Sequence, residues 1–204
     1  WVRIGSGCRI HPHGHIAAHT TIGPRCEIYP YASVGTPPQD LKFDGRRTET
    51  IIGTDNIIRE FVTINRASVG GNSTTRVGDH NFLMACSHVA HDCVVGNRTV
   101  FLHAATLGGH VTVGDFATVG ALSAVHQFCR IGRLTMVGAQ SKVTQDLPPF
   151  MLVEGNPAET RTLNKVGLER NGVSDEAQTA LKHAYKILFR DGLTTANALA
   201  RAGV

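Results

Sequence analysis

The sequence predicts an all-β fold, a left-handed parallel β-helix, and three observations support this prediction. Aliphatic residues or Phe recur every six residues, Gly often follows them directly, and a small residue often stands two positions before them. Six residues suit a short strand followed by a tight corner that accepts only a small inward side chain. Three such units would close a triangular coil, and stacked coils would pair as parallel strands about 4.8 Å apart.

The six-residue period runs in three blocks, which two polar insertions separate. Its positions are Ile4, Ile10, Ile16, Ile22, Ile28, Val34, Ile52, Ile58, Ile64, Val77, Leu83, Val89, Val95, Phe101, Leu107, Val113, Val119, Val125, Ile131, Val137 and Val143. These positions are enough for seven coils. The insertions, residues 35–50 and 65–76, are polar and contain Gly or Pro, so we expect them to leave the coils as loops.

The repeat ends near residue 150, where the stretch QDLPPF carries two consecutive prolines. We therefore expect the β-helix to fill residues 1–150 and a small α-helical domain to fill residues 151–204. In that domain we expect a helix over about residues 159–171, a second one capped by Ser174, and a short third one towards Val204. The chain begins inside the repeat and stops soon after the third helix, so we expect both ends to be truncated.

The composition narrows the possible partners and the location. The net charge is +4 and the sequence pI is about 9.0, without a run of Lys or Arg, which favours an acidic ligand or partner over nucleic acid. The sequence has no run of eighteen apolar residues and no signal peptide, so we expect no integral membrane segment. Four of the five cysteines occupy the small inward position of the repeat, and only Cys86 does not. We therefore expect free thiols in a soluble, cytoplasmic protein.

The stretch HVAHDC carries the first two of several histidines that come together when the sequence is stacked in steps of eighteen residues. His91, His110 and His126 then fall in one narrow strip on three successive coils, with Gln127 beside them. His88 lies one strand-step before His91. A single histidine there would fit an ordinary surface position, whereas four in one strip indicate a site.

Two chemical interpretations of this strip remain open. Three histidines could bind a metal at about 2.0–2.1 Å. Neighbours on adjacent coils could reach one ion, whereas His91 to His126 spans two coils, roughly 10 Å, which one chain cannot bridge but a site between subunits could. Alternatively, His91 is a neutral base that a carboxylate orients. Asp92 adjoins it, but neighbouring strand residues face opposite sides, so their pairing would need a turn. Gly109, stacked on His91, offers a backbone N–H as an oxyanion donor.

Several motifs occur in one order along most of the chain: QDLKF, IREFVTINR, HVAHDCVVGN, ATLGGHV, AVHQFC, QDLPPF and NKVGLERNG. In these motifs, over about residues 4–190, the chain resembles the acyl-carrier-protein–UDP-N-acetylglucosamine O-acyltransferases, which start lipid A synthesis. The resemblance implies a homotrimer with active sites in clefts between neighbouring β-helices. It also implies transfer of an R-3-hydroxyacyl chain from acyl carrier protein to the glucosamine 3-hydroxyl of UDP-N-acetylglucosamine, with no metal and no other cofactor.

The resemblance also assigns roles to individual residues. His91 would be the general base, with Asp92 supporting it, and Gly109 would supply the oxyanion N–H. The residues implied to line the sugar pocket are Gln39, Asp40 and Lys42, those implied to contact substrate or the acyl arm are His88, His110, His126 and Gln127, and those implied to hold the nucleotide and its phosphates are Asn164 and Arg170.

Three positions depart from the family's pattern. Asn65 stands where a histidine is usual near the substrate, and Val166 replaces a Glu in the helix that contacts the nucleotide. These two leave open whether the acceptor carries a 3-hydroxyl or a 3-amino group. Ala139 stands where some members have a Gly that admits a long acyl chain, so its methyl group is expected to act as the acyl-chain ruler.

Other functions are compatible with the same scaffold. A related hexapeptide N-acyltransferase or a small-molecule acetyltransferase would keep the fold and change the substrate, although the QDLK loop and the C-terminal NKVGLERNG favour the O-acyltransferase. A γ-type carbonic anhydrase would use the histidines as metal ligands. A structural or ice-binding β-helix would need flat, repetitive Thr faces, which the sequence lacks.

Overall fold

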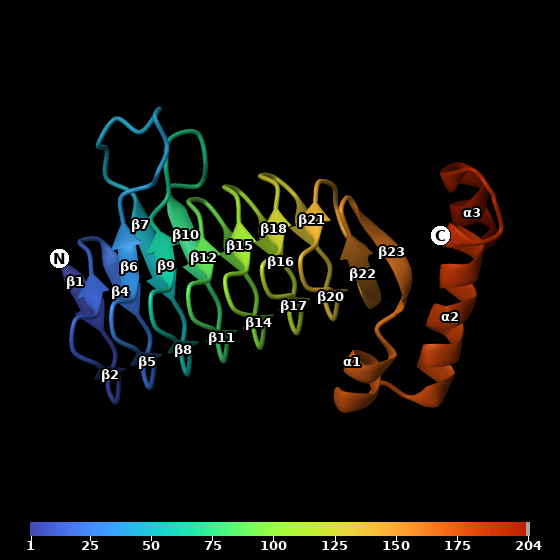
Figure 1. Ribbon diagram of the computed structural model, residues 1–204, viewed down its shortest axis with the longest axis horizontal. Coiled ribbons are helices and arrows are strands. Elements are labelled where there is room, and N and C mark those ends of the chain that lie inside the picture. The colour runs from blue at the N-terminus through green and yellow to red at the C-terminus, as the bar shows by residue number, and fades with distance from the viewer. Residues whose placement is uncertain (203–204) are drawn as a thin grey trace.

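The computed structural model describes residues 1–202 and confirms the predicted left-handed parallel β-helix. Strands β1 to β21 form seven triangular coils, whose sides stack into three parallel sheets (Figure 1). We name these sheets A, B and C in the order in which the chain passes through them in each coil. After the last coil the chain forms a hairpin and then helices (Figure 1).

Each sheet takes one short strand from every coil. Sheet A consists of β1 (Val2–Ile4), β4 (Thr20–Ile22), β7 (Glu49–Ile52), β10 (Thr74–Val77), β13 (Val94–Val95), β16 (Thr112–Val113) and β19 (Arg130–Ile131). Sheet B consists of β2 (Arg9–Ile10), β5 (Glu27–Ile28), β8 (Ile57–Ile58), β11 (Phe82–Leu83), β14 (Val100–Phe101), β17 (Thr118–Val119), β20 (Met136–Val137), β22 (Met151–Gly155) and β23 (Ala158–Leu163). Sheet C consists of β3 (His15–Ile16), β6 (Ser33–Thr36), β9 (Thr63–Asn65), β12 (His88–Val89), β15 (Thr106–Leu107), β18 (Ala124–Val125) and β21 (Lys142–Val143).

The coils stack in register because the repeat length is constant. Val89 pairs with Leu107 and Leu107 with Val125, which is the eighteen-residue step that the sequence predicts. The aliphatic residues of the period form the interior, where Leu83 and Phe101, for example, are fully buried. Burying one such side chain completely stabilises the fold by about 1.5–3 kcal/mol. Burial of these interior side chains is therefore the main contribution that holds the coils together.

The cysteines follow the repeat as predicted, and all five are free thiols. Cys26, Cys93 and Cys129 are buried at the small corner position, Cys8 is half-buried there, and Cys86 is exposed. Burial raises the pKa of the Cys93 thiol to about 12. This thiol therefore stays protonated and behaves as a small apolar residue.

The corners of the coils share one backbone conformation. The second residue of the corner turn has a positive φ, as at His80 (58°), Asp92 (59°) and Leu122 (58°). A residue with a side chain adopts this left-handed conformation only at a cost. Hydrogen bonds between successive corners offset that cost, such as the one from His110 N–H to the His91 carbonyl at 3.0 Å. We call the corners A–B, B–C and C–A after the sheets that they join.

The two polar insertions leave the coils as loops, and both do so at the C–A corner. Residues 37–48 connect β6 to β7, and residues 66–73 connect β9 to β10. The loops project together from the N-terminal half of the stack (Figure 1), and a hydrogen bond from Ser68 to Asp40 joins them. The predicted histidine strip lies on the following coils at this same corner, so the loops border it.

The segment after residue 150 differs in part from the prediction. A helix over residues 159–171 is expected from the sequence, but this expectation is wrong for its first part. β22 pairs in parallel with β20, and β23 pairs with β22 in antiparallel orientation. β22 extends sheet B and would leave an open edge, which β23 covers. Pairing with an existing sheet thus outweighs the local preference for helix.

Helices occupy only the later part of the region that was expected to be helical. They are α1 (Lys165–Arg170), α2 (Asp175–Phe189) and α3 (Thr195–Ala202). Ser174 caps α2 as predicted, because its side chain accepts the Ala177 N–H. The predicted approach of the third helix to Val204 lies outside the described residues. Among residues 1–202, no helix is long and apolar enough to cross a membrane.

Candidate active site

A histidine and a neighbouring carboxylate pair at the C–A corner. His91 and Asp92 form the turn that follows β12, and the positive φ of Asp92 turns its side chain back towards His91. The His91 Nδ1 and Asp92 Oδ2 atoms are 2.9 Å apart. Because the carboxylate engages Nδ1, the other ring nitrogen, Nε2, is the one left to accept a proton. The turn that this pairing requires is therefore present.

The Asp92 carboxylate is held from several sides. Its side chain is 3% exposed, and Oδ2 also accepts the Ser68 N–H at 2.8 Å. The Asp92 N–H donates to Thr75 Oγ1 at 2.8 Å. Oδ1 is buried and has no hydrogen-bond partner among residues 1–202. Gly71 passes directly over this carboxylate, where a Cβ atom would collide with it. The second loop therefore packs on Asp92 at a point where no side chain fits.

Two further predicted histidines lie around this pair. The ring centroids of His91 and His110 are 5.2 Å apart in an edge-to-face arrangement, and His110 Nε2 lies 3.9 Å from Asp92 Oδ2. His88 Nδ1 is 2.7 Å from Thr63 Oγ1. Burial, followed by the charge of the neighbouring His91, lowers the pKa of His88. This shift favours neutral His88 at pH 7.

Gly109 lies against the His91 ring, as the stacking predicts. A Cβ atom at residue 109 would lie 2.5 Å from His91 Cε1 and 2.7 Å from Nε2, so only glycine leaves this ring in place. Within residues 1–202 the Gly109 N–H donates no backbone hydrogen bond, whereas the following His110 N–H donates to the His91 carbonyl. The residue that touches Nε2 thus carries an N–H that can bind a ligand atom.

Asp40 reaches the same corner from the first loop. Its Oδ2 accepts the Ser68 hydroxyl at 2.6 Å, and its Oδ1 accepts the Lys42 N–H at 3.0 Å. The bond from Ser68, then that from Lys42, and more weakly the charge of His91, keep the pKa of Asp40 below its usual range. Asp40 is therefore ionised at neutral pH. Gln39 and Lys42 flank it on the exposed surface of the loop.

Three other predicted residues differ in how they face this site. His126 and Gln127 are exposed on the second coil after His91, and His126 Nδ1 lies 3.0 Å from the Gln127 carbonyl oxygen. Asn65 is 2% exposed, and its Nδ2 donates to Thr36 Oγ1 at 2.9 Å. Its side chain therefore links the bases of the two loops and presents little surface to a ligand.

The remaining predicted residues lie at other corners of the chain. Ala139 is exposed in the B–C corner after β20. Asn164 Nδ2 donates to the Leu134 carbonyl at the A–B corner, at 2.9 Å. Asn164 and Arg170 line a hollow of about 380 Å³ beside Met136 of sheet B. A single chain thus places Ala139, Asn164 and Arg170 apart from the histidine pair.

Ser68 and Gly71 are part of this site but have no signal in the repeat. Ser68 is buried and bonded to both carboxylates, and Gly71 covers one of them. Both lie in a loop outside the six-residue period, so no periodicity assigns them to the corner. The consecutive glycines at 70 and 71 are the one sequence signal, because a loop that passes closely over a buried group needs residues without a Cβ atom.

The donors at this corner also have the composition of a metal site. His91, Asp92 and His110 each offer one ligand atom, and these atoms lie within 4.8 Å of one another. Such a set of histidine and carboxylate ligands suits Zn²⁺ or Fe²⁺. The same contacts also serve a proton acceptor, since Asp92 Oδ2 already engages His91 Nδ1 and the Ser68 N–H. The geometry alone is thus compatible with both chemistries.

The coiled fold and the histidine–carboxylate corner together are typical of a hexapeptide-repeat acyltransferase. The family model described as UDP N-acetylglucosamine O-acyltransferase, domain 2, matches residues 146–203. The acyl-[acyl-carrier-protein]–UDP-N-acetylglucosamine O-acyltransferase of Thermodesulfovibrio yellowstonii is 51% identical over 198 residues, which cover 97% of this chain and 77% of the relative. The enzyme of the same name from Thiobacillus denitrificans is 49% identical over 177 residues, 87% of this chain and 69% of its own.

The fold comparison agrees with these sequences. The solved structure of LpxA from Acinetobacter baumannii matches with a TM-score of 0.94 at 39% identity, covering 99% of this chain and 78% of that one. The chain therefore belongs to the acyl-[acyl-carrier-protein]–UDP-N-acetylglucosamine O-acyltransferase family.

Proposed function

We propose that this chain transfers an R-3-hydroxyacyl chain from acyl carrier protein to the glucosamine 3-position of UDP-N-acetylglucosamine, the first step of lipid A synthesis. Membership of the family supports these substrates, because the relatives are named for them. The main structural support for this reaction is at the C–A corner, where His91 pairs with Asp92 and its ring lies against Gly109.

In this mechanism His91 is the general base. Its Nε2 takes the proton of the sugar 3-hydroxyl while the hydroxyl oxygen attacks the thioester carbon, and Asp92 stabilises the imidazolium that forms. The Gly109 N–H donates to the oxyanion of the tetrahedral intermediate. The intermediate then collapses with cleavage of the C–S bond, and His91 returns the proton to the departing thiolate. The products are the acylated sugar nucleotide and the free thiol of the carrier protein.

The surrounding residues hold the substrates in this proposal. Ionised Asp40 accepts hydrogen bonds from the sugar hydroxyls, in a pocket that Gln39 and Lys42 line. The residues that contact substrate or the acyl arm are His88, His110, His126 and Gln127. Asn65, where the family has a histidine, is buried and links the bases of the two loops instead. Asn164 and Arg170 hold the nucleotide and its phosphates. Ala139 limits the length of the acyl chain.

We further propose a homotrimer with the sites between neighbouring β-helices, in the cytoplasm. His91, Ala139 and Arg170 would all serve one reaction, yet in one chain they lie at the C–A corner, at the B–C corner and in α1. A neighbouring chain that packs against the C–A corner would complete the site. The five free cysteines support a reducing compartment.

The test is an acylation assay with a mass readout. Purified protein is incubated with 3-hydroxyacyl carrier proteins of several chain lengths and with either UDP-N-acetylglucosamine or its 3-amino analogue. The expected result is one singly acylated product from the 3-hydroxy acceptor. Product only from the 3-amino analogue would move the assignment to a variant acceptor, and the absence of any acylated product would overturn the proposal.

One observation favours a second candidate, a γ-type carbonic anhydrase: His91, Asp92 and His110 could bind a metal ion. Elemental analysis of the active protein separates the two candidates. We expect no stoichiometric metal and no effect of chelators on acyl transfer. About one zinc or iron per subunit, together with chelator-sensitive activity, would instead support the metal enzyme.

A further inference from the structure

Ser68 connects two carboxylates that come from different parts of the chain. It lies in the loop between β9 and β10 and is 1% exposed. Its hydroxyl donates to Asp40 Oδ2 at 2.6 Å, and its N–H donates to Asp92 Oδ2 at 2.8 Å. Because it is buried, Ser68 itself offers no surface to a substrate. Its contacts are with Asp40, which is half-buried, and with Asp92, which pairs with His91.

These two bonds belong to one continuous series of contacts. Asp40 Oδ1 accepts the Lys42 N–H, so the Ser68 hydroxyl fixes the other oxygen of the same carboxylate. At the other end, Asp92 Oδ2 receives the Ser68 N–H and lies 2.9 Å from His91 Nδ1. The group proposed to bind the sugar and the group proposed to orient the base are therefore positioned by a single residue.

The loops do not depend on Ser68 alone for their attachment. The Arg66 N–H donates to the Thr36 carbonyl at 2.9 Å, and Asn65 Nδ2 donates to Thr36 Oγ1 at the same distance. Removal of the Ser68 hydroxyl would therefore leave the loop in place. Only one of the two Ser68 bonds involves its side chain, so a substitution can remove the bond to Asp40 and keep the bond to Asp92.

We propose that Ser68 is a positioning residue with two separable effects: its hydroxyl orients Asp40 for the acceptor sugar, and its N–H orients Asp92 for His91. This inference rests on the proposed acyl transfer. It predicts that the hydroxyl governs binding of the sugar nucleotide, whereas the backbone contact governs the chemical step.

The first test is Ser68→Ala, measured by steady-state kinetics with both substrates varied. We expect the KM for UDP-N-acetylglucosamine to rise about 10-fold, as for loss of a hydrogen bond to a charged group. The KM for acyl carrier protein and kcat should change by less than about threefold, since the Asp92 contact remains. A fall in kcat with unchanged KM values would overturn the proposed division of roles.

A matched control is Ser123→Ala, the same substitution at an equally buried serine. Its hydroxyl donates to the Gly138 carbonyl at 2.8 Å, in the interior of the coil. This variant should lose thermal stability without a selective change in the KM for the sugar nucleotide. If Ser123→Ala raised that KM as much as Ser68→Ala does, general loosening of the fold would explain the effect and the proposal would fail.

A double-mutant cycle tests the link to Asp40 directly. Asp40→Ala should raise the KM for the sugar nucleotide, and adding Ser68→Ala to it should have little further effect, because the acceptor of the hydroxyl is already absent. Additive effects would overturn the proposal. Ser68→Thr, which keeps the hydroxyl, should restore a KM near that of the wild type. If this variant misfolds because of its extra methyl group, the cycle still decides the question.

The two levels of the proposal fail in different ways. Wild-type protein that makes no acylated product overturns the proposed function, and this inference with it. Active wild-type protein with additive Ser68 and Asp40 effects overturns only the role of Ser68.

Discussion

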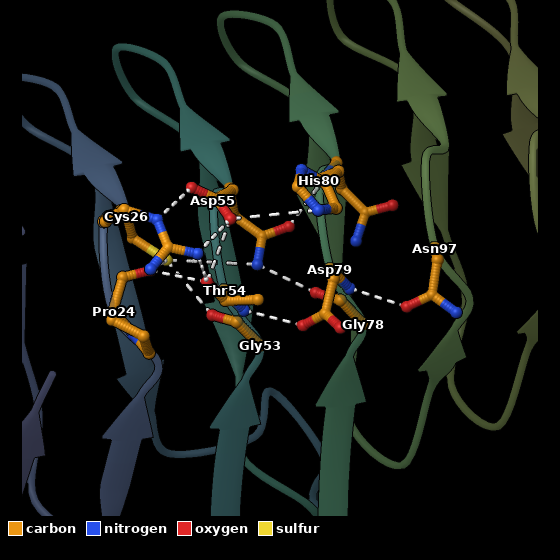
Figure 2. Close-up of polar contacts among 12 residues, drawn as sticks. Pro24, Cys26, Gly53, Thr54, Asp55, Gly78, Asp79, His80 and Asn97 are labelled. Atoms are coloured by element: carbon orange, nitrogen blue, oxygen red, sulfur yellow. Dashed lines mark hydrogen bonds and ion pairs between the residues drawn. The ribbon is translucent and has the colours of Figure 1, made fainter.

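The A–B and C–A corners use the same turn but treat its first backbone N–H in opposite ways. At the A–B corner, side chains cap these N–H groups one coil after another (Figure 2). Asp79 Oδ1 accepts the Thr54 N–H at 2.7 Å, and Asn97 Oδ1 accepts the Asp79 N–H at 2.8 Å. Asp115 Oδ1 continues the series by accepting the Asn97 N–H at 2.7 Å. The N–H groups of Thr54, Asp79 and Asn97 are therefore all paired within the protein.

The same turn position at the C–A corner is occupied by His91, Gly109 and Gln127. Gly109 has no side chain that could cap the N–H below it, and the space is filled by the His91 ring. Within residues 1–202, the Gly109 N–H in turn donates to no backbone acceptor. A buried or half-buried backbone donor normally has a partner. Gly109 thus omits the cap on the His91 N–H, and within residues 1–202 the Gln127 side chain does not cap the Gly109 N–H, whereas the A–B corner pairs the N–H groups of Thr54, Asp79 and Asn97.

The carboxylates at the second turn position, Asp55 and Asp92, also differ between the two corners in the partner that each one binds. Asp55 at the A–B corner receives two bonds from Arg25, at 2.8 and 2.6 Å. A guanidinium does not give up its proton, so this pair is purely structural. Asp92 at the C–A corner pairs instead with His91, a side chain whose second ring nitrogen can accept a proton from a ligand. The same scaffold position thus has an arginine partner at one corner and a histidine partner at the other, and only the histidine can serve as the proposed base.

The largest expected effect is that of His91→Ala. Loss of general-base assistance should lower kcat by roughly 10²–10⁴-fold, while the rigid coils keep the protein folded. Rates measured with saturating substrates, together with a melting curve, check this expectation. His80→Ala is the matched control at the A–B corner, because its half-exposed ring lies 3.8 Å from Asp55 and should not affect the rate. A His91→Ala protein that retains more than about a tenth of the wild-type rate would exclude His91 as the base.

Gly109→Ala tests the position of the His91 ring against the Gly109 backbone. The added Cβ atom would lie 2.5 Å from His91 Cε1, so the ring must move away from its position beside the amide. A displacement of about 1 Å at a reacting group can cost about 10²-fold in rate. We expect a loss of this order in kcat, with the far-ultraviolet circular dichroism unchanged. An unchanged kcat would show that the position of the His91 ring beside Gly109 does not matter.

Much of this fold can be predicted from the sequence, because a six-residue period has few structural solutions. The period places Val89, Leu107 and Val125 in one column, and the structure pairs them. The strand at Ala158–Leu163 could not be predicted in the same way. Its residues have no period, and they become a strand only because the edge of sheet B is there to be paired.

The candidate site was predictable only where it follows the repeat. The stacking of Gly109 on His91 is a consequence of the eighteen-residue step. The pairing of His91 with Asp92 depends on a left-handed turn, which the alternation of strand residues does not reveal. The contacts of Ser68 depend on how a loop folds over the coil. A loop has no repeating period, so the sequence does not predict which residues its side chains contact.

Asp79→Ala tests the structural corner. It leaves the Thr54 N–H without its partner, which should destabilise the fold by about 1–3 kcal/mol. The catalytic parameters of the folded enzyme should not change, since this corner has no proposed role in the reaction. Urea unfolding at one fixed protein concentration measures the stability, because any assembly makes it depend on concentration. A loss of kcat/KM larger than about threefold would contradict the expectation that the A–B corner has only a structural role.

Ala139→Gly extends the comparison to the B–C corner, where Ala139 holds the turn position that Asp79 and Gly109 hold elsewhere. The wild type should prefer acyl chains of about ten to twelve carbons over fourteen, since each CH₂ that cannot be buried forfeits roughly 0.8 kcal/mol, about fourfold in affinity. Ala139→Gly should move this preference to longer chains. Competition between donors of different length, with products resolved by mass, measures the ratio. A ratio that the substitution leaves unchanged would place the ruler elsewhere.

The smallest expected effect concerns the pH dependence of stability at His88. Burial lowers the pKa of this residue from its ordinary value of 6.5, so the folded protein binds the proton less tightly than the unfolded chain does. The contribution of His88 to the free energy of unfolding is therefore fully present above pH 6.5, the ordinary pKa of histidine. It decreases as the pH falls from there towards the lower pKa of the folded state, and it is constant below that pKa.

His88→Gln should remove this decrease. The wild type should lose more stability than the variant between about pH 7.5 and about pH 5.5, as measured by urea unfolding at fixed protein concentration. His103→Gln, a substitution of an exposed histidine at another corner, serves as the control and should follow the wild type. If His88→Gln and the wild type lost the same stability over this range, burial would not favour the neutral form of His88 in the folded protein. Its hydrogen bond with Thr63 would then be the whole of its contribution to the fold.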